Sequence, residues 1–178
     1  MDLAELKHFV AEGETDRVEF KKSTGQRTEA AKTLCAMLNG AGGHVLFGVT
    51  NRGDLVGQDV SDKTIQELVS ELKRIDPPVQ PAIQKVAVGN AKHVLVIEAK
   101  GGDEVYAYDG RSYLRHGNTT SLMPRRQYES LLLERLHPRE RWENQFAADW
   151  VKLADLDAEE IQSTVDAAIR LGRMNPIK

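Results

Sequence analysis

Residues 36–49 read Ala36-Met37-Leu38-Asn39-Gly40-Ala41-Gly42-Gly43-His44-Val45-Leu46-Phe47-Gly48-Val49. Apolar residues at helical spacing begin at Ala31 and reach Leu38. The glycines of residues 39–43 then end the helix. Residues 44–49 form an apolar run that is typical of a buried strand. The stretch therefore predicts a helix that turns sharply into a strand of the core.

The direction of this glycine turn, residues 39–43, bears on nucleotide binding. Phosphate-binding loops run from a strand into a helix, so that backbone amides and the helix N-terminus face the phosphate. Here the turn runs from a helix into a strand, and it has neither a Gly-Lys-Ser/Thr ending nor GxGxxG spacing. We interpret the turn as a helix cap, and ATP binding stays open as an alternative.

Hydrophobic periodicity and turn residues predict the other elements. The expected helices cover residues 1–13, 28–38 with Thr28 as the cap, 61–74, 124–136 and about 161–169. The expected strands cover residues 17–21, 44–49, 55–57, 82–88, 93–99, 106–108 and 113–115. Tight turns at 51–54, 89–90 and 109–110 each predict a hairpin. Most strand pairing should therefore be antiparallel.

Length and composition narrow the class of protein. A chain of 178 residues fits one compact domain with a helical tail. With 40% hydrophobic and 29% charged residues, the composition excludes disordered and fibrous proteins. Cys35 is the only cysteine, which excludes an internal disulfide and a cysteine-based metal cluster. No run approaches about 18 apolar residues, so we expect no membrane partner and a cytoplasmic location.

Charge is distributed unevenly. The net charge of -3 and the pI near 6.0 are not typical of a nucleic-acid-binding protein. The acidic excess lies in residues 143–178, however, whereas residues 1–142 carry equal numbers of basic and acidic side chains. Residues 111–126 contain four arginines and no acid. A second basic cluster lies in residues 17–32. These two clusters are candidate phosphate-binding surfaces.

Three acidic residues, Glu14, Asp16 and Glu19, lie close together around the first expected strand. Paired carboxylates can hold a divalent ion beside a phosphodiester. A third carboxylate is not fixed by local spacing, so ordinary surface charge is the preferred interpretation. The five histidines show no metal-ligand spacing, and no G-x-S-x-G elbow is present.

The segment around residues 111–120 mixes cations, hydroxyls and a glycine turn. This mixture is typical of contacts with phosphate oxygens. Tyr106, Tyr108 and Tyr113 offer rings that stack on exposed bases. Tyrosines at alternate positions of a hairpin also pack across strands, and both interpretations stay open.

Four ordered motifs together resemble one known family, the Schlafen AlbA-2 family. They are Glu14-Thr-Asp-Arg-Val-Glu19-Phe-Lys21, the stretch 36–49, Gly53-Asp-Leu-Val-Gly57 and Tyr113-Leu-Arg115-His-Gly117-Asn-Thr119-Thr120. The similarity spans about residues 12–136. The segment Arg141-Trp142-Glu143-Asn144 and the acidic and helical residues after it resemble the stretch that joins this domain to the rest of bacterial regulators described as RecG-like helicases or ATP-binding proteins.

The resemblance implies an α+β fold with a mixed, largely antiparallel sheet, packed helices and a helical C-terminal tail. It divides the chain into a Schlafen AlbA-2-like domain at residues 1–137 and a linker or tail at 138–178 that leads toward a further C-terminal region. The family is described as a DNA-binding module, often N-terminal in bacterial transcriptional regulators, and is sometimes grouped with divergent ATPase domains.

The animal relatives of the family include RNA-binding proteins and tRNA-directed endoribonucleases. Their nuclease site resembles two glutamates near the first strand and an aspartate in the glycine turn. Glu14 and Glu19 match the two glutamates, while the third position falls at Ala41, which carries no carboxylate. The alternative to a binding module is therefore an endoribonuclease that uses Mg²⁺ or Mn²⁺ held by Glu14 and Glu19.

We expect a binding module rather than an enzyme, with DNA or RNA as its partner and contacts mainly to backbone phosphates. The predicted contacts are Arg17, Lys21, Lys22, Arg111, Arg115, Asn118, Thr119 and Arg125, and the predicted glycine-turn residues are Asn39, Gly42 and Gly43. A mixed sheet with an exposed edge and an amphipathic tail also predicts a homodimer.

Overall fold

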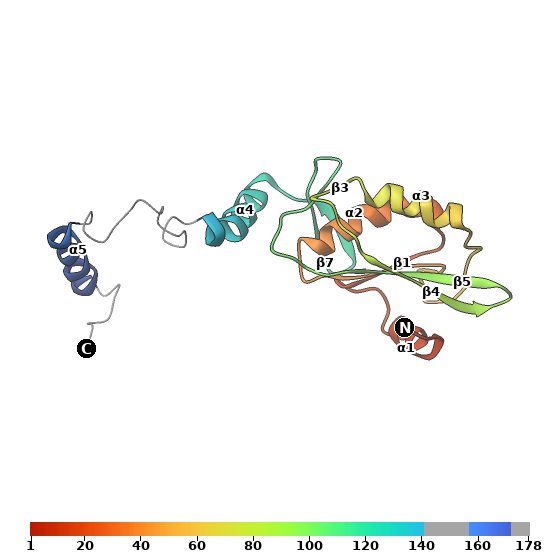
Figure 1. Cartoon of the computed structure of the whole chain (residues 1–178). Coiled ribbons are helices and arrows are strands. Elements are labelled where there is room, and N and C mark those ends of the chain that lie inside the picture. Colours follow the sequence, from red (N-terminus) through yellow and green to blue (C-terminus); the bar gives the residue numbers. More distant parts are fainter. Residues whose placement is uncertain (141–156, 172–178) are drawn as a thin grey trace. The chain divides into compact units, whose positions relative to one another are not determined.

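A computed structural model describes residues 1–140 and 157–171 (Figure 1). The helices are α1 (Leu3–Ala11), η1 (Thr24–Gln26, a 3-10 turn), α2 (Arg27–Leu38), α3 (Asp62–Leu72), α4 (Arg125–Glu140) and α5 (Ala158–Arg170). The strands are β1 (Val18–Lys21), β2 (Gly43–Phe47), β3 (Ile75–Asp76), β4 (Ala82–Gly89), β5 (Lys92–Ala99), β6 (Ala107–Tyr108), β7 (Tyr113–His116) and β8 (Thr119–Leu122). The α+β fold class is confirmed.

The main sheet has four strands in the order β1-β2-β5-β4. β1 and β2 are parallel, with Glu19 opposite Val45, and the other pairs are antiparallel. β4 and β5 form the hairpin that the turn at 89–90 predicts, and Asn90 has a positive φ of 49° in that turn. The sheet is therefore mixed and largely antiparallel, as expected.

Helices cover both faces of this sheet (Figure 1). On one face, α2 and α3 pack over the side chains of Val45, Phe47 and Ile97. On the other face, Leu6 and Val10 of α1 pack over a second cluster. This cluster contains the strand residues that alternate with those of the first cluster, so their side chains point to the opposite face of the sheet. Neighbouring side chains along β2 point to opposite faces of the sheet and are buried in different clusters. β2 is therefore a strand that is buried on both faces.

Local sequence explains where the helices begin. Ser61 caps α3 and accepts a hydrogen bond from the Thr64 amide, as expected for a helix that starts there. α2 differs from the prediction, because it begins at Arg27 and Gln26 is its cap residue. The Thr28 hydroxyl instead donates to a carboxylate oxygen of Glu71 on α3, so the predicted cap joins two helices.

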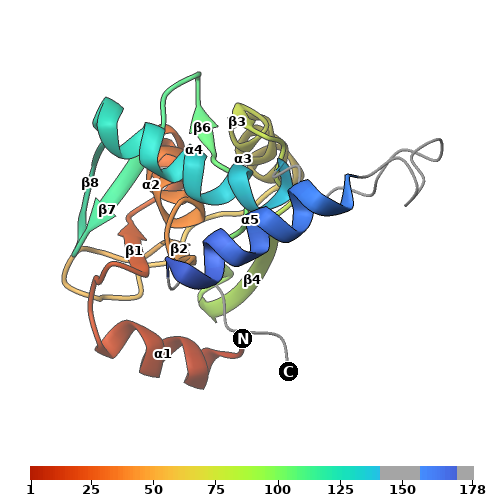
Figure 2. The same ribbon diagram turned by 90° about the vertical axis from the view of Figure 1, so that its left-hand side faces the viewer.

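Two predicted hairpins are wrong. Residues 55–57 form no strand, and a single bridge joins Val49 to Leu55. The strands on either side of the turn at 109–110 do not pair along their lengths: β6 pairs with β3, and β7 pairs with β8. The resulting β7–β8 hairpin lies beside α2 (Figure 2). Its second strand, Thr119–Leu122, lacks the apolar alternation that identifies strands in a sequence.

The chain divides into two compact units, Met1–Arg139 and Glu140–Lys178. In the second unit the structure describes α5, whose cap residue Asp157 accepts hydrogen bonds from the amides of Glu159 and Glu160. The tail motif at 141–144 lies outside the described residues. None of the described helices is both long and apolar enough to cross a membrane.

Candidate nucleic-acid interface

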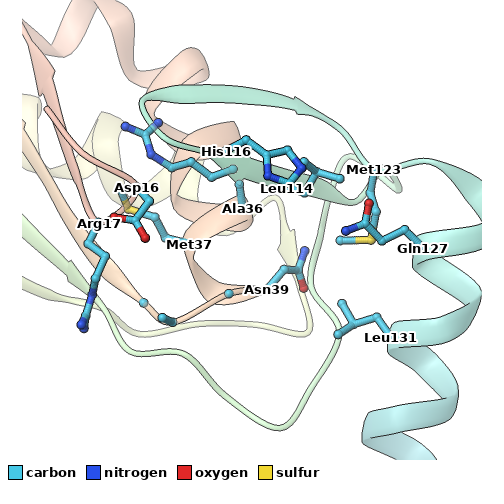
Figure 3. Close-up of a pocket in the computed structure, with 14 residues that line it drawn as sticks. Asp16, Arg17, Ala36, Met37, Asn39, Leu114, His116, Met123, Gln127 and Leu131 are labelled. Atoms are coloured by element: carbon cyan, nitrogen blue, oxygen red, sulfur yellow. The ribbon is translucent and has the colours of Figure 1, made fainter.

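Three of the sequence motifs meet at one pocket of about 200 Å³, which we call the motif pocket (Figure 3). Its walls come from the residues before β1, from the end of α2 and the glycine turn, from β7, and from the start of α4. The lining residues are Asp16, Arg17, Ala36, Met37, Asn39, Gly40, Ala41, Gly42, Leu114, Arg115, His116, Met123, Gln127 and Leu131. The fold therefore brings together segments that are far apart in the sequence, from Asp16 to Leu131.

The floor of the motif pocket is apolar and its rim is polar. Ala36, Met37, Leu114 and Met123 are each 9% exposed or less. Asp16, Arg17, His116 and Gln127 are exposed at the rim. Across the described residues, the guanidinium of Arg17 forms no ion pair, so its charge is free to meet an anion.

Arg115 lies in the wall with a side chain only 3% exposed. Its guanidinium donates to the carbonyl oxygens of Thr15 and Val18, to a carboxylate oxygen of Glu19 at 2.7 Å, and to the hydroxyl of Thr120. The Thr120 hydroxyl is also 3.0 Å from that of Thr33 on α2. Arg115 thus fastens the β7–β8 hairpin to the start of β1.

Comparison with known proteins places this arrangement in a family. The family model described as "Schlafen, AlbA_2" matches residues 14–124, which contain nearly all the walls of the motif pocket. The chain belongs to the Schlafen AlbA_2 family. No curated protein matches the sequence.

Two solved structures match this Schlafen AlbA_2 chain, and the first of them shares its fold. The DIP2311 protein of Corynebacterium diphtheriae is 16% identical with a TM-score of 0.52, over 94% of this chain and 34% of that one. This chain therefore spans about a third of that protein's length. The N-terminal domain of a protein from Nitrosomonas europaea, described as related to the ATP-dependent DNA helicase RecG, is 23% identical with a TM-score of 0.46, over 57% of this chain and 74% of that one.

The two glutamates predicted as metal ligands, Glu14 and Glu19, have other partners here. Glu14 accepts a 2.9 Å hydrogen bond from the amide of Phe20. Both carboxylate oxygens of Glu19 accept from cations, one from Lys21 and the other from Arg115. A divalent ion would have to displace two positive charges from Glu19. Within residues 1–140 and 157–171, no group of three or more His, Cys, Asp or Glu side chains is arranged to hold a metal. This arrangement does not fit a divalent-metal site.

The glycine turn of this Schlafen AlbA_2 domain allows neighbouring backbone segments to pack closely. Gly42 has a φ of 78°, and a Cβ atom there would lie 2.5 Å from the carbonyl oxygen of Ala99. A Cβ atom at Gly43 would lie 2.5 Å from the carbonyl oxygen of Arg17. Glycine is needed at both positions because three backbone segments approach closely. The turn ends α2 and leads into β2, which agrees with the interpretation as a helix cap.

Asn39 holds the turn in place with a buried side chain. Its amide nitrogen donates to the carbonyl oxygens of Tyr106 and Tyr113, and its amide oxygen accepts from the Tyr106 amide. Its backbone carbonyl accepts a 2.6 Å hydrogen bond from Arg135 on α4. A cation at the C-terminal end of α2 is favourable because that end carries partial negative charge. Asn39 therefore positions the pocket wall and has no amide group left for a ligand.

The predicted phosphate contacts fall into separate places. Arg17 lies at the pocket rim, and Asn118 and Thr119 are exposed on the β7–β8 turn. The guanidinium side chain of Arg125 is 90% exposed at the start of α4 and pairs with Glu129. The remaining cations are distributed elsewhere: Lys21 and Arg115 lie in the Glu19 ion pairs, Lys22 at the far end of β1, and Arg111 in the β6–β7 turn.

Sequence reasoning did not single out the apolar floor of the pocket. Met37 looks like an ordinary core residue of a helix, Gln127 and Leu131 lie in the helix expected at 124–136, and Met123 immediately precedes that helix. The signal that could have found them is positional. Met37 lies inside a family motif and Met123 lies just after one, whereas Gln127 and Leu131 lie further along the chain, and only the three-dimensional fold shows which side chains converge.

Proposed function

We propose that this domain binds nucleic acid by contacting the phosphates of the nucleic-acid backbone. The proposed contact surface, which we call the hairpin face, consists of Arg17, His116, Asn118, Thr119 and Arg125. The observation that carries the proposal is the exposed guanidinium of Arg17, which forms no ion pair with any residue that the structure describes. An unpaired arginine loses no existing ion pair when it meets a phosphate, and its planar fork matches two phosphate oxygens.

The other residues of the hairpin face supply the remaining phosphate chemistry. Asn118 and Thr119 offer an amide and a hydroxyl on an exposed turn, and such groups commonly contact phosphate oxygens. Arg125 pairs with Glu129 four residues later on α4. An exposed pair of this kind is worth only about 0–1 kcal/mol, so phosphate can compete for the guanidinium. Membership of the Schlafen AlbA_2 family supports the same class of partner.

The proposal assigns no phosphate contact to Arg115 or Lys21. Moving either side chain to a ligand would remove one of the two cations that pair with the Glu19 carboxylate, which is 9% exposed. Losing part of the compensation of a buried charge is destabilising. Binding without cleavage fits these ion pairs better than a nuclease site that depends on Glu19. A domain that contacts only the nucleic-acid backbone is consistent with a role within a transcriptional regulator, in which other parts of the protein would carry the other activities.

The test measures binding by fluorescence anisotropy with labelled single-stranded RNA, single-stranded DNA and duplex DNA across a salt series. Wild-type affinity should fall linearly on a log–log plot as salt rises, because bound phosphates release counterions. Arg17→Ala with Arg125→Ala should weaken binding and reduce the salt slope by roughly 0.7–0.9 for each phosphate that the variant no longer neutralises.

The matched control is Lys63→Ala with Lys73→Ala, which removes two exposed cations from the region of α3. Since α3 contributes nothing to the hairpin face, the control should keep the wild-type salt slope. Equal slopes for the test and control variants, or no binding to any of the three probes at low salt, would refute the proposal.

A further inference from the structure

We propose that the motif pocket holds one unstacked nucleobase, so that the domain prefers single-stranded nucleic acid over a duplex. This inference rests on the proposed function, because it names the form of nucleic acid that the hairpin face would bind. Three properties of the pocket carry it: its size, the chemistry of its floor, and the polar groups at its rim.

The size of the motif pocket limits its occupant to one ring system. Its volume is about 200 Å³, whereas pockets for drug-sized ligands measure roughly 300–1,000 Å³. A whole nucleotide with its sugar and phosphate would therefore extend beyond the pocket. A single base fits this limit, with its sugar and phosphate left outside at the rim.

The floor suits a flat aromatic ring. The thioethers of Met37 and Met123 approach from opposite sides of the pocket, with Ala36 and Leu114 between them (Figure 3). Methionine sulfur is polarisable and makes favourable contacts with aromatic rings. Both methionines are fixed by burial, at 1% and 9% exposure, so little side-chain freedom remains to be lost when a ring enters.

The rim can satisfy the polar edge of a base. The carboxylate of Asp16 and the side-chain amide of Gln127 lie at opposite ends of the pocket (Figure 3). Neither has a side-chain hydrogen bond to any residue that the structure describes. Asp16 accepts from an N–H group, and Gln127 both donates and accepts. Every base presents donors and acceptors on its edge, so these groups can pair with a base without restricting the pocket to one.

Arg17 joins the pocket to the hairpin face. It follows Asp16 directly in the chain, and its exposed side chain extends outward from the pocket (Figure 3), so a nucleotide with its base in the pocket leaves its phosphate outside, on the side where the guanidinium lies. A duplex offers this arrangement only after a base is unpaired and unstacked, which costs a few kcal/mol. A single strand bears much less of that cost.

The experiment uses the full chain and three probes of equal length: a single-stranded oligonucleotide, a hairpin duplex, and a single strand in which every base is replaced by an abasic residue. The single strand should bind about tenfold more tightly than either of the other two, as expected when a base is accommodated. Arg17→Ala should weaken binding to all three probes.

Two variants address the pocket itself. Ala41→Trp places a large side chain at the exposed mouth, and Gln127→Ala removes an exposed rim amide. Both should weaken binding to the single strand and leave binding to the duplex and abasic probes unchanged. The matched control is Ala87→Trp, at an exposed position on β4, which should behave as wild type.

The outcomes separate the two proposals. Equal binding of all three probes, with Arg17→Ala still weakening each of them, would overturn the base pocket and leave phosphate binding in place. The base pocket would also be overturned if neither Ala41→Trp nor Gln127→Ala changed binding to the single strand. Absence of binding to every probe would refute the proposed function and the base pocket with it.

Discussion

The guanidinium of Arg115 donates a 2.7 Å hydrogen bond to the carboxylate of Glu19, although 96 positions separate the two residues. Both side chains are nearly inaccessible, at 3% and 9% exposure. This pair connects β7 to β1 and fixes one wall of the motif pocket. These contacts give the two charged motif residues a structural role in holding β7 against β1.

Arg115→Ala should lower the free energy of unfolding by about 3–5 kcal/mol. The substitution leaves the Glu19 carboxylate with Lys21 as its remaining cation and releases the carbonyl oxygens of Thr15 and Val18. Urea denaturation measures the change. Arg111→Ala, which removes an exposed arginine, should change stability by less than about 0.5 kcal/mol. Equal stability of the two variants would contradict a structural role for the Arg115 pair.

Asn39→Ala should destabilise the domain by about 3 kcal/mol, since it leaves the Tyr106 amide and two carbonyl groups without their partner. Asn39→Asp should be similarly harmful, because a carboxylate cannot donate to the carbonyl oxygens of Tyr106 and Tyr113. Asn118→Ala, at an exposed turn, is the control and should have little effect. Thermal unfolding distinguishes these cases. A mild effect of Asn39→Asp would show that the two donated hydrogen bonds contribute little.

Gly42→Ala should lower the free energy of unfolding by about 1–3 kcal/mol more than Gly110→Ala does. Both glycines have positive φ, at 78° and 70°, so the strain on an alanine backbone is shared. The difference lies in the surroundings, since a Cβ atom at Gly42 meets the Ala99 carbonyl oxygen at 2.5 Å, and one at Gly110 meets nothing within 4 Å. Denaturant midpoints of the two variants give the comparison. Equal midpoints would mean that the backbone at Gly42 can shift at little cost.

Cys35 should make stability depend on pH in the alkaline range. Burial raises the pKa of its thiol from 9.0 to about 11, and the thiol donates to the Tyr106 carbonyl at 3.4 Å. The folded state thus disfavours the thiolate, so the stabilisation is complete below pH 9 and is lost as pH rises toward 11. Denaturation at about pH 8 and about pH 10.5 should show a larger decrease for the wild type than for Cys35→Ala.

The comparison with Cys35→Ala also removes the contribution of Tyr108. Burial raises the pKa of Tyr108 to about 12, so this group adds its own alkaline dependence in both proteins. A decrease of the same size in the two proteins would therefore show that the Cys35 thiol ionises as readily in the folded state as in the unfolded state.

Local signals in the sequence predicted much of the fold. The capping residue Ser61, the glycines after α2 and the turn at 89–90 act through neighbouring atoms, so their effects are visible from spacing alone. The β7–β8 hairpin was missed because Thr119–Leu122 is polar. That strand depends on distant contacts, including the Thr33–Thr120 hydroxyl pair.

The candidate site was less predictable than the fold. Arg17 and Arg115 look alike in the sequence, as arginines beside motif residues. The structure exposes the first and buries the second against Glu19. Long-range pairing decides which arginine is free, and no local pattern encodes a partner 96 positions away.

The contacts of Arg115 and Glu14 also cover backbone groups at one edge of the main sheet. β1 is at the end of the sheet order, with Arg17 and Lys21 bonded through their carbonyl oxygens toward β2. The alternate residues therefore present their backbone groups to the open side. There, Arg115 occupies the carbonyl oxygen of Val18, and Glu14 occupies the amide of Phe20. An incoming strand finds both groups already taken, which protects this end of the sheet against augmentation and aggregation.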